Sequence, residues 1–122
     1  MIAAAYAYAA LTLLPIGCQL GLAAGAPWGT YTMAGKYPGR LPPHARRLAV
    51  VQAGILAFCA LAVLDRAGVG PLGLPPFAFT VALVATGLSL VANAASPSRP
   101  ERRLWTPVLI AMFLTALAAG YL

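Results

Sequence analysis

Apolar residues follow one another in four long runs, and the polar residues of the chain gather in the short stretches between them. The runs cover about residues 2–24, 45–64, 77–95 and 104–122, and charged residues lie only at their ends or outside them. Each run has the roughly 20 residues that a helix needs to cross the hydrocarbon layer of a bilayer. None shows the regular alternation of a membrane-spanning strand. The sequence therefore predicts an all-α polytopic membrane protein, a four-transmembrane-helix bundle in which residues 1–122 form a single membrane domain.

The first run also ends like a secretory signal peptide, because residues 22–26, Leu-Ala-Ala-Gly-Ala, resemble a cleavage site. A signal peptide has a basic segment before a short apolar core, whereas this run begins apolar and stays apolar over a full span. We therefore expect this segment to be kept as the first helix.

Composition supports lipid as the solvent of this chain. Hydrophobic residues make up 61% and charged residues 8%, whereas soluble domains have about 45–50% and about 25%. The net charge of +6 does not indicate nucleic-acid binding, because the basic residues lie beside apolar runs and form no extended patch with interleaved aromatic residues. They are placed to face the headgroups of membrane lipids.

The basic residues are distributed unequally between the connections. Those in the first and third connections are Lys36, Arg40, Arg46, Arg47, Arg99, Arg102 and Arg103. The second connection has only Arg66, beside Asp65. Since connections rich in Lys and Arg stay in the cytoplasm, we expect the first and third connections to be cytoplasmic and both termini to lie on the outer side of the membrane.

Four glycines, Gly17, Gly21, Gly25 and Gly29, recur at every fourth position from the end of the first run. On a helix they would form a flat stripe that allows close helix packing in lipid. The stripe favours packing against another helix of the same chain; the alternatives are a homodimer seam and the docking face of a larger membrane-protein partner. Pro27 argues against helix continuing as far as Gly29.

Uncharged polar side chains occur at similar depth in three of the runs, at Gln19, Gln52, Ser89 and Asn93. They predict either a small polar pocket near the cytoplasmic side or hydrogen bonds between helices that stabilise the bundle.

The first connection, from Gly25 to Arg47, combines turn-forming residues with aromatic and basic ones. Its most informative residues are Trp28, Lys36, Tyr37, Arg40, Arg46 and Arg47. Glycine and proline define backbone shape, and aromatic rings prefer the headgroup region. We expect an ordered interfacial loop, which serves either for binding or only to return the chain to the membrane.

Residues for catalysis are few. His44, Asp65 and Glu101 lie in different connections, so the sequence predicts no catalytic residues, no metal site and no cofactor. Ser98 and Glu101 form a helix-start signature before the last run. No ionisable side chain lies in the interior of a run, which argues against a proton-coupled transporter of the small four-helix multidrug type. Antiparallel neighbours place Cys18 and Cys59 at different depths, too far apart for a disulfide.

Three sequence features carry a resemblance to a known group of proteins. They are a Gly-Ala-Pro-Trp-Gly segment after the first run, a Pro-Gly-x-Leu-Pro-Pro stretch before the second, and Asn93 near the end of the third. In these the chain resembles small, uncharacterised four-helix integral membrane proteins of bacteria. The resemblance implies the same topology in the bacterial cytoplasmic (inner) membrane, and no catalytic residues.

The leading functional hypothesis is a small non-catalytic structural or accessory subunit that contacts lipids and packs with itself or with a larger membrane partner. The alternative is an oligomeric channel or carrier for a small uncharged or anionic solute, built around the four polar residues.

Overall fold

The computed structural model describes all residues from 1 to 122 as four long helices and three connections, without a strand. The long helices are α1 (Ile2–Ala23), α2 (Pro43–Arg66), α3 (Pro76–Ala94) and α4 (Arg99–Tyr121), and the first connection contains the short 3-10 helices η1 (Gly29–Tyr31) and η2 (Met33–Gly35). All four long helices have the length and apolar character needed to cross a membrane. The prediction of an all-α, four-helix membrane architecture is confirmed.

The last helix begins earlier than the apolar pattern predicts, at Arg99 instead of residue 104. The Ser98 hydroxyl caps it by accepting a hydrogen bond from the backbone N–H of Glu101, at 3.4 Å, and a proline occupies the first turn. Proline fits there because the first helical N–H groups have no partner within the helix. Glu101 therefore belongs to the helix and not to the connection before it.

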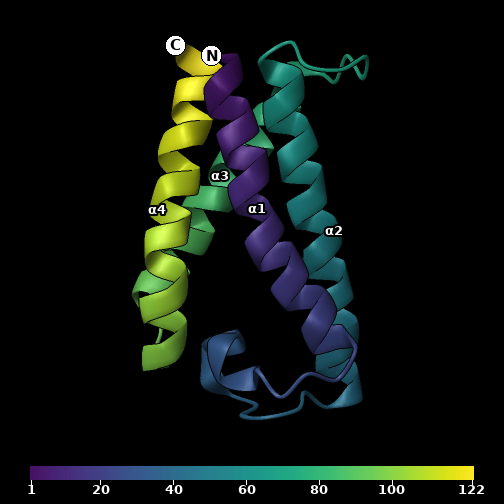
Figure 1. Ribbon diagram of the computed structural model, residues 1–122, viewed down its shortest axis with the longest axis vertical. Coiled ribbons are helices and arrows are strands. Elements are labelled where there is room, and N and C mark those ends of the chain that lie inside the picture. The colour runs from purple at the N-terminus through teal and green to yellow at the C-terminus, as the bar shows by residue number, and fades with distance from the viewer.

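Successive helices run antiparallel, so both chain ends lie at the same end of the bundle as the α2–α3 connection (Figure 1). The Met1 ammonium group donates to the carbonyl of Ala119 at 3.0 Å, which joins α1 to the end of α4. We call this the terminal end. The opposite end, which holds residues 24–42 and 95–98, we call the basic end.

The bundle is a wedge that opens toward the basic end. α1 lies beside α4 at the terminal end and diverges from it toward α2, while α3 crosses behind the other helices from α2 to α4 (Figure 1). The two diverging helices each contain an internal proline, Pro15 in α1 and Pro107 in α4. An internal proline removes a helical hydrogen bond and bends the helix, which favours the separation.

The terminal half of the wedge is closely packed. Its core contains many small residues, among them Ala5, Ala82 and Ala116, which are fully buried. Small side chains allow helix backbones to approach closely in lipid. Halfway along the bundle, the Tyr8 and Thr86 hydroxyls share a buried hydrogen bond of 2.8 Å that joins α1 to α3.

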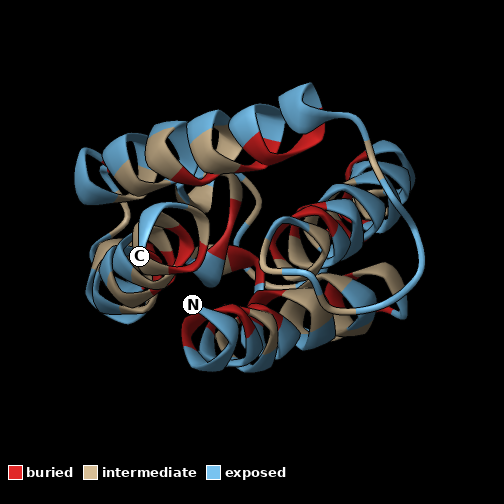
Figure 2. Cartoon of the chain, turned by 90° about the horizontal axis from the view of Figure 1, so that it is seen from above, coloured by how far each residue is buried: buried red, intermediate tan, exposed pale blue.

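The outward faces of the helices are exposed and apolar (Figure 2). Leu14, Val51, Leu88 and Leu114 are each more than half exposed. Exposed apolar area of this extent is unfavourable in water and suits contact with lipid chains.

Candidate functional site

A cavity of about 570 Å³ lies between the α1–α2 pair and the α3–α4 pair, in the half of the bundle near the basic end. All four helices and the first connection contribute to its walls. Most of the lining is apolar, for example Leu56 on α2 and Val108 on α4, and a few polar groups face the space. This composition is typical of a small-molecule site.

The four polar residues of the predicted pocket, Gln19, Gln52, Ser89 and Asn93, all line this cavity. They do not bind one another across helices. Asn93 donates its side-chain N–H to the carbonyl of Ser89 on its own helix, at 2.8 Å, and the buried Gln19 Oε1 has no hydrogen-bond partner. Among the residues that line the cavity, a hydrogen bond between two long helices is made by Tyr8 and Thr86, which the sequence pattern did not single out.

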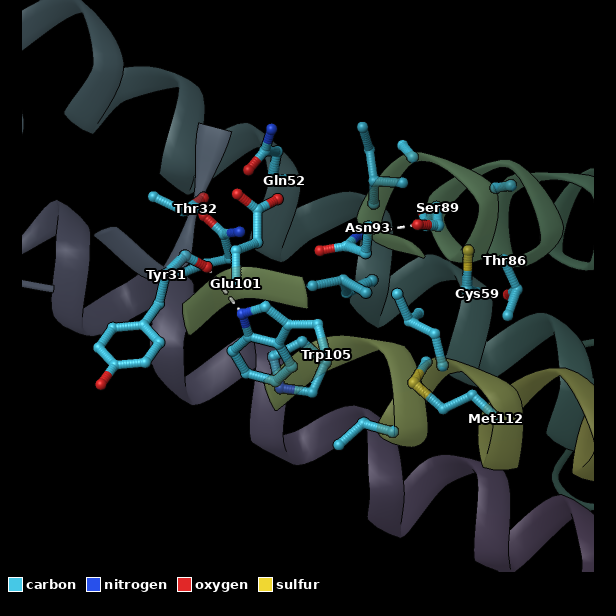
Figure 3. A pocket seen from close by; sticks show the side chains of 18 of the residues that line it. Tyr31, Thr32, Gln52, Cys59, Thr86, Ser89, Asn93, Glu101, Trp105 and Met112 are labelled. Carbon is cyan, nitrogen blue, oxygen red and sulfur yellow. Dashed lines mark hydrogen bonds between the residues drawn. The ribbon is translucent and has the colours of Figure 1, made fainter. Parts of the chain in front are cut away.

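Glu101 is the residue that the sequence analysis misplaced. It is only 8% exposed, lines the cavity, and its Oε2 is buried without a hydrogen-bond partner. Figure 3 shows its carboxylate directed toward Gln52. No ionisable side chain lies in the interior of an apolar run, but α4 begins one turn before the last run, and from this first turn the Glu101 carboxylate reaches the cavity.

The capping signature at the start of α4 is only half used, which frees this carboxylate. The Ser98 hydroxyl caps the helix, but the Ser98 N–H donates to the Ser96 hydroxyl at 3.1 Å instead of to the glutamate. Glu101, Trp105 and Met112 recur at spacings of four and seven residues along the cavity-facing side of α4. Helical periodicity thus contained the signal that places the carboxylate inside.

The deep end of the cavity lies against the closely packed half of the bundle. Tyr8, Cys59, Thr86 and Met112 line it there, and Cys59 is a free, buried thiol. Cys18 is also free, as predicted. From Glu101 to Met112 the helical rise corresponds to about 16 Å, so the cavity extends across roughly half of the hydrocarbon layer and does not pass through it.

The first connection closes the cavity at the basic end. The Trp105 indole N–H donates to the carbonyl of Tyr31 at 2.7 Å, and the Ser98 hydroxyl donates to the carbonyl of Thr30 (Figure 3 shows the first of these bonds). Met33 and Ala34, which line the cavity, have φ angles of 50° and 58°. Such positive values are uncommon outside glycine and are held by surrounding contacts.

Arginine side chains order the rest of this connection. Arg40 Nε donates to the carbonyl of Gly25 at 2.9 Å, and Arg46 Nε donates to the carbonyl of Ala23 at 3.0 Å, so they satisfy backbone groups at the end of α1. Tyr37 binds His44 through its hydroxyl, at 3.1 Å to Nε2.

Two further basic residues of this connection lie at the surface. The Lys36 ammonium lies 5.4 Å from the centre of the Tyr37 ring. Arg47 is exposed at the start of α2. The connection is therefore an ordered loop that keeps exposed positive charge at the basic end.

The glycines at every fourth position do not form a seam against another helix of the chain. Gly17 is exposed, with no atom within 4 Å of the position where a Cβ would lie, and Gly21 contacts the Trp28 ring. Gly25 lies beyond α1 at a φ of 101°, beside Arg40. Gly29, in η1, donates its N–H to the carbonyl of Gly39 at 2.8 Å. Three of the four glycines thus shape the first connection.

The exposed lining of the cavity is distributed unequally. The lining residues on α1 and α4 are buried or half-buried, whereas exposed ones lie on α2 (Ile55), on α3 (Ser89 and Ala92) and in the first connection (Tyr31 and Ala34). Within the bundle, the exposed lining is therefore on the side of α2 and α3.

Comparison with known protein families, curated proteins and solved structures finds no match to this chain. The structure supports a four-helix, apolar membrane protein. The resemblance to small bacterial membrane proteins adds no family or activity to this description.

Proposed function

We propose that this membrane protein is a carrier or receptor that binds a small amphiphilic molecule in the wedge cavity. The observation that carries the proposal is that unpaired polar groups from two helices, α1 and α4, face one largely apolar space. Gln19 Oε1 and Glu101 Oε2 are buried there without hydrogen-bond partners. Unpaired buried polar groups cost free energy, and a bound molecule would remove that cost.

The form of the cavity favours uptake from the bilayer over conduction through a pore. Ser89 and Ala92 on α3 are exposed lining residues on the side of the bundle, while the first connection covers the basic end. At the deep end, the bond between Tyr8 and Thr86 lies against a closely packed core. A channel would need a continuous polar path at this point, so the proposal is a binding protein or carrier.

The role proposed is binding and not catalysis. Glu101 is the one carboxylate at the cavity, and the only histidine, His44, is exposed and bound to Tyr37. An acid and base pair, or a nucleophile with a base beside it, would need a second such group in the cavity.

We place the protein in the bacterial cytoplasmic membrane with the basic end in the cytoplasm and both termini outside. The support is the unequal distribution of Lys and Arg between the connections. Exposed Lys36, Arg40 and Arg47 are positioned to contact anionic headgroups.

Cys59 provides a native reporter for this proposal, because its thiol lines the deep end of the cavity. In a Cys18→Ala background, we expect methyl methanethiosulfonate, a small uncharged reagent, to label Cys59. Ala85→Trp, which fills the cavity from α3, should slow labelling strongly. Ala57→Trp, on the exposed face of α2, is the matched control and should leave the rate unchanged. Equal rates in the two variants, or no labelling in the parent, would overturn the proposal.

A second candidate function is the structural or accessory subunit, which associates with itself or with a larger membrane protein. The observation that favours it is the outward face of α1, where Gly17 leaves a site open beside exposed Leu13 and Leu20. The native mass of the protein extracted in a mild detergent tests this role, since it requires a homodimer or a stoichiometric partner.

A further inference from the structure

Two hydrogen-bond acceptors that face the cavity are buried without a donor, Gln19 Oε1 and Glu101 Oε2. The Asn93 amide donates one N–H to the carbonyl of Ser89. The amides of Gln19, Gln52 and Asn93 bring both donors and acceptors to the cavity. The group that distinguishes the site is therefore the Glu101 carboxylate, which when ionised can only accept.

The Glu101 carboxylate brings negative charge to this site, and the basic residues around it are engaged elsewhere. Arg40 and Arg46 donate to carbonyls at the end of α1, and Arg102 donates to the carbonyl of Ser96 at 2.7 Å. The positive charge of the chain therefore lies around the basic end and not inside the cavity. A buried carboxylate without a partner is costly, and a bound cation offsets that cost.

The remainder of the cavity specifies the rest of the ligand. Beyond Glu101 the walls are mostly apolar, with Ile55, Leu56 and Leu109 among their residues. The Trp105 ring stands one turn from the carboxylate on α4, where an indole favours a neighbouring cation.

On the basis of the proposed function, we infer that the cavity binds an organic cation, a molecule with a primary ammonium group held by Glu101 and an apolar body directed toward Tyr8 and Met112. Three N–H donors of an ammonium group match the acceptors of Glu101, Gln19 and Asn93. This inference reverses the charge expected from the net charge of the chain, because an anionic solute would face the carboxylate.

Three probes with one skeleton and different charge test this inference. They are 2-phenylethylamine as the cation, 2-phenylethanol as the neutral compound and phenylacetate as the anion. Each is titrated against Cys18→Ala protein in an uncharged detergent at neutral pH, and binding is read from protection of Cys59 against methyl methanethiosulfonate. We expect the amine to protect at about tenfold lower concentration than the alcohol, as one charge-assisted hydrogen bond provides, and phenylacetate to protect least.

Glu101→Gln assigns the preference to this residue. The variant keeps the shape of the side chain and the backbone N–H that binds Ser98, so we expect the fold to persist, the alcohol to bind as before, and the preference for the amine to disappear. Asp65→Asn is the matched control, because Asp65 is the only other carboxylate and lies at the terminal end, where it accepts from Gly73 and Leu74. It should leave the tenfold preference unchanged.

The outcomes separate this inference from the proposed function. Equal protection by the amine and the alcohol would leave the binding cavity standing and overturn the charge class. A preference that persists in Glu101→Gln would overturn the role of Glu101. Absence of protection by all three probes would overturn the inference, and the labelling rate of Cys59 without any probe decides separately whether the cavity is accessible. If Glu101→Gln does not fold, the three titrations of the Cys18→Ala protein still decide which charge the cavity prefers.

Discussion

The two halves of the bundle are built from the same four helices but packed in opposite ways. At the terminal end, alanines and the Phe79 ring pack closely in the core, and Gly120 lies directly against that ring. At the basic end the helices separate, and a loop and a cavity occupy the gap. The contrast shows that close helix packing can be concentrated in one half of a small membrane protein, while the other half keeps a cavity with unpaired polar groups.

The comparison predicts that added bulk destabilises the protein to different extents at two positions one turn apart on α3. Ala82 is fully buried in the terminal core, and Ala85 lines the cavity. We expect Ala82→Leu to lower the free energy of unfolding by about 1–3 kcal/mol through overpacking, and Ala85→Leu to lower it by less than about 1 kcal/mol because the side chain has space. Unfolding by a denaturing detergent in mixed micelles measures both. Equal losses would mean that the two halves are packed alike.

The hydrogen bond between Tyr8 and Thr86, at the boundary of the two halves, should make the next largest contribution to the free energy of unfolding. Thr86→Val removes the partner of the buried Tyr8 hydroxyl. We expect it to cost about 1–2 kcal/mol in the free energy of unfolding, because that hydroxyl remains buried without its partner on α3. Thr86→Ser keeps the hydroxyl and is the control. If valine were tolerated as well as serine, the bond would contribute nothing to joining α1 and α3.

Closure of the basic end should depend on the bond between Trp105 and Tyr31. Trp105→Phe keeps an aromatic ring and removes the indole donor. If the free energy that favours the closed loop falls by about 1 kcal/mol, Cys59 should be labelled roughly fivefold faster. Methyl methanethiosulfonate is again the reagent. Trp28→Phe, at the other end of the same loop against Gly21, is the control. An unchanged rate in Trp105→Phe would show that the loop does not control access.

The smallest effect is expected on the outer face of α1. Gly17→Ala has space for its methyl group, and alanine is the better helix former by about 1 kcal/mol at most, so the thermal midpoint should stay equal or rise slightly. Gly120→Ala is the contrasting variant, because its methyl group would collide with the Phe79 ring and should lower the midpoint. A decrease in native mass for Gly17→Ala would show that this face holds another chain.

The sequence predicted the spans because length and apolar character alone determine them, and α1 ends within one residue of the predicted boundary. It also brought Gln19, Gln52, Ser89 and Asn93 to one depth, since helical rise converts position in the chain into depth. It could not tell whether these side chains bind one another or face a space, because that depends on the angle between helices.

Glu101 was missed for a different reason. The helix-start signature predicts the cap at Ser98, which the structure contains, but it does not show that the Glu101 side chain turns into the cavity instead of binding the Ser98 N–H. The regular spacing of the four glycines likewise predicted a helix seam that the structure does not contain. Gly25 and Gly29 serve positive φ and close backbone contact in the loop, and regular spacing does not distinguish these needs from a helix seam.

On α3, the exposed lining of the cavity, Ser89 and Ala92, lies in the half of the bundle at the basic end. Under the proposed function, a molecule that enters beside these residues would come from a single leaflet, so occupancy of the cavity would follow the concentration in that leaflet and not in the membrane as a whole. A compound supplied from the opposite side would first have to flip across the bilayer, and its rate of flipping would then limit how quickly the protein responds.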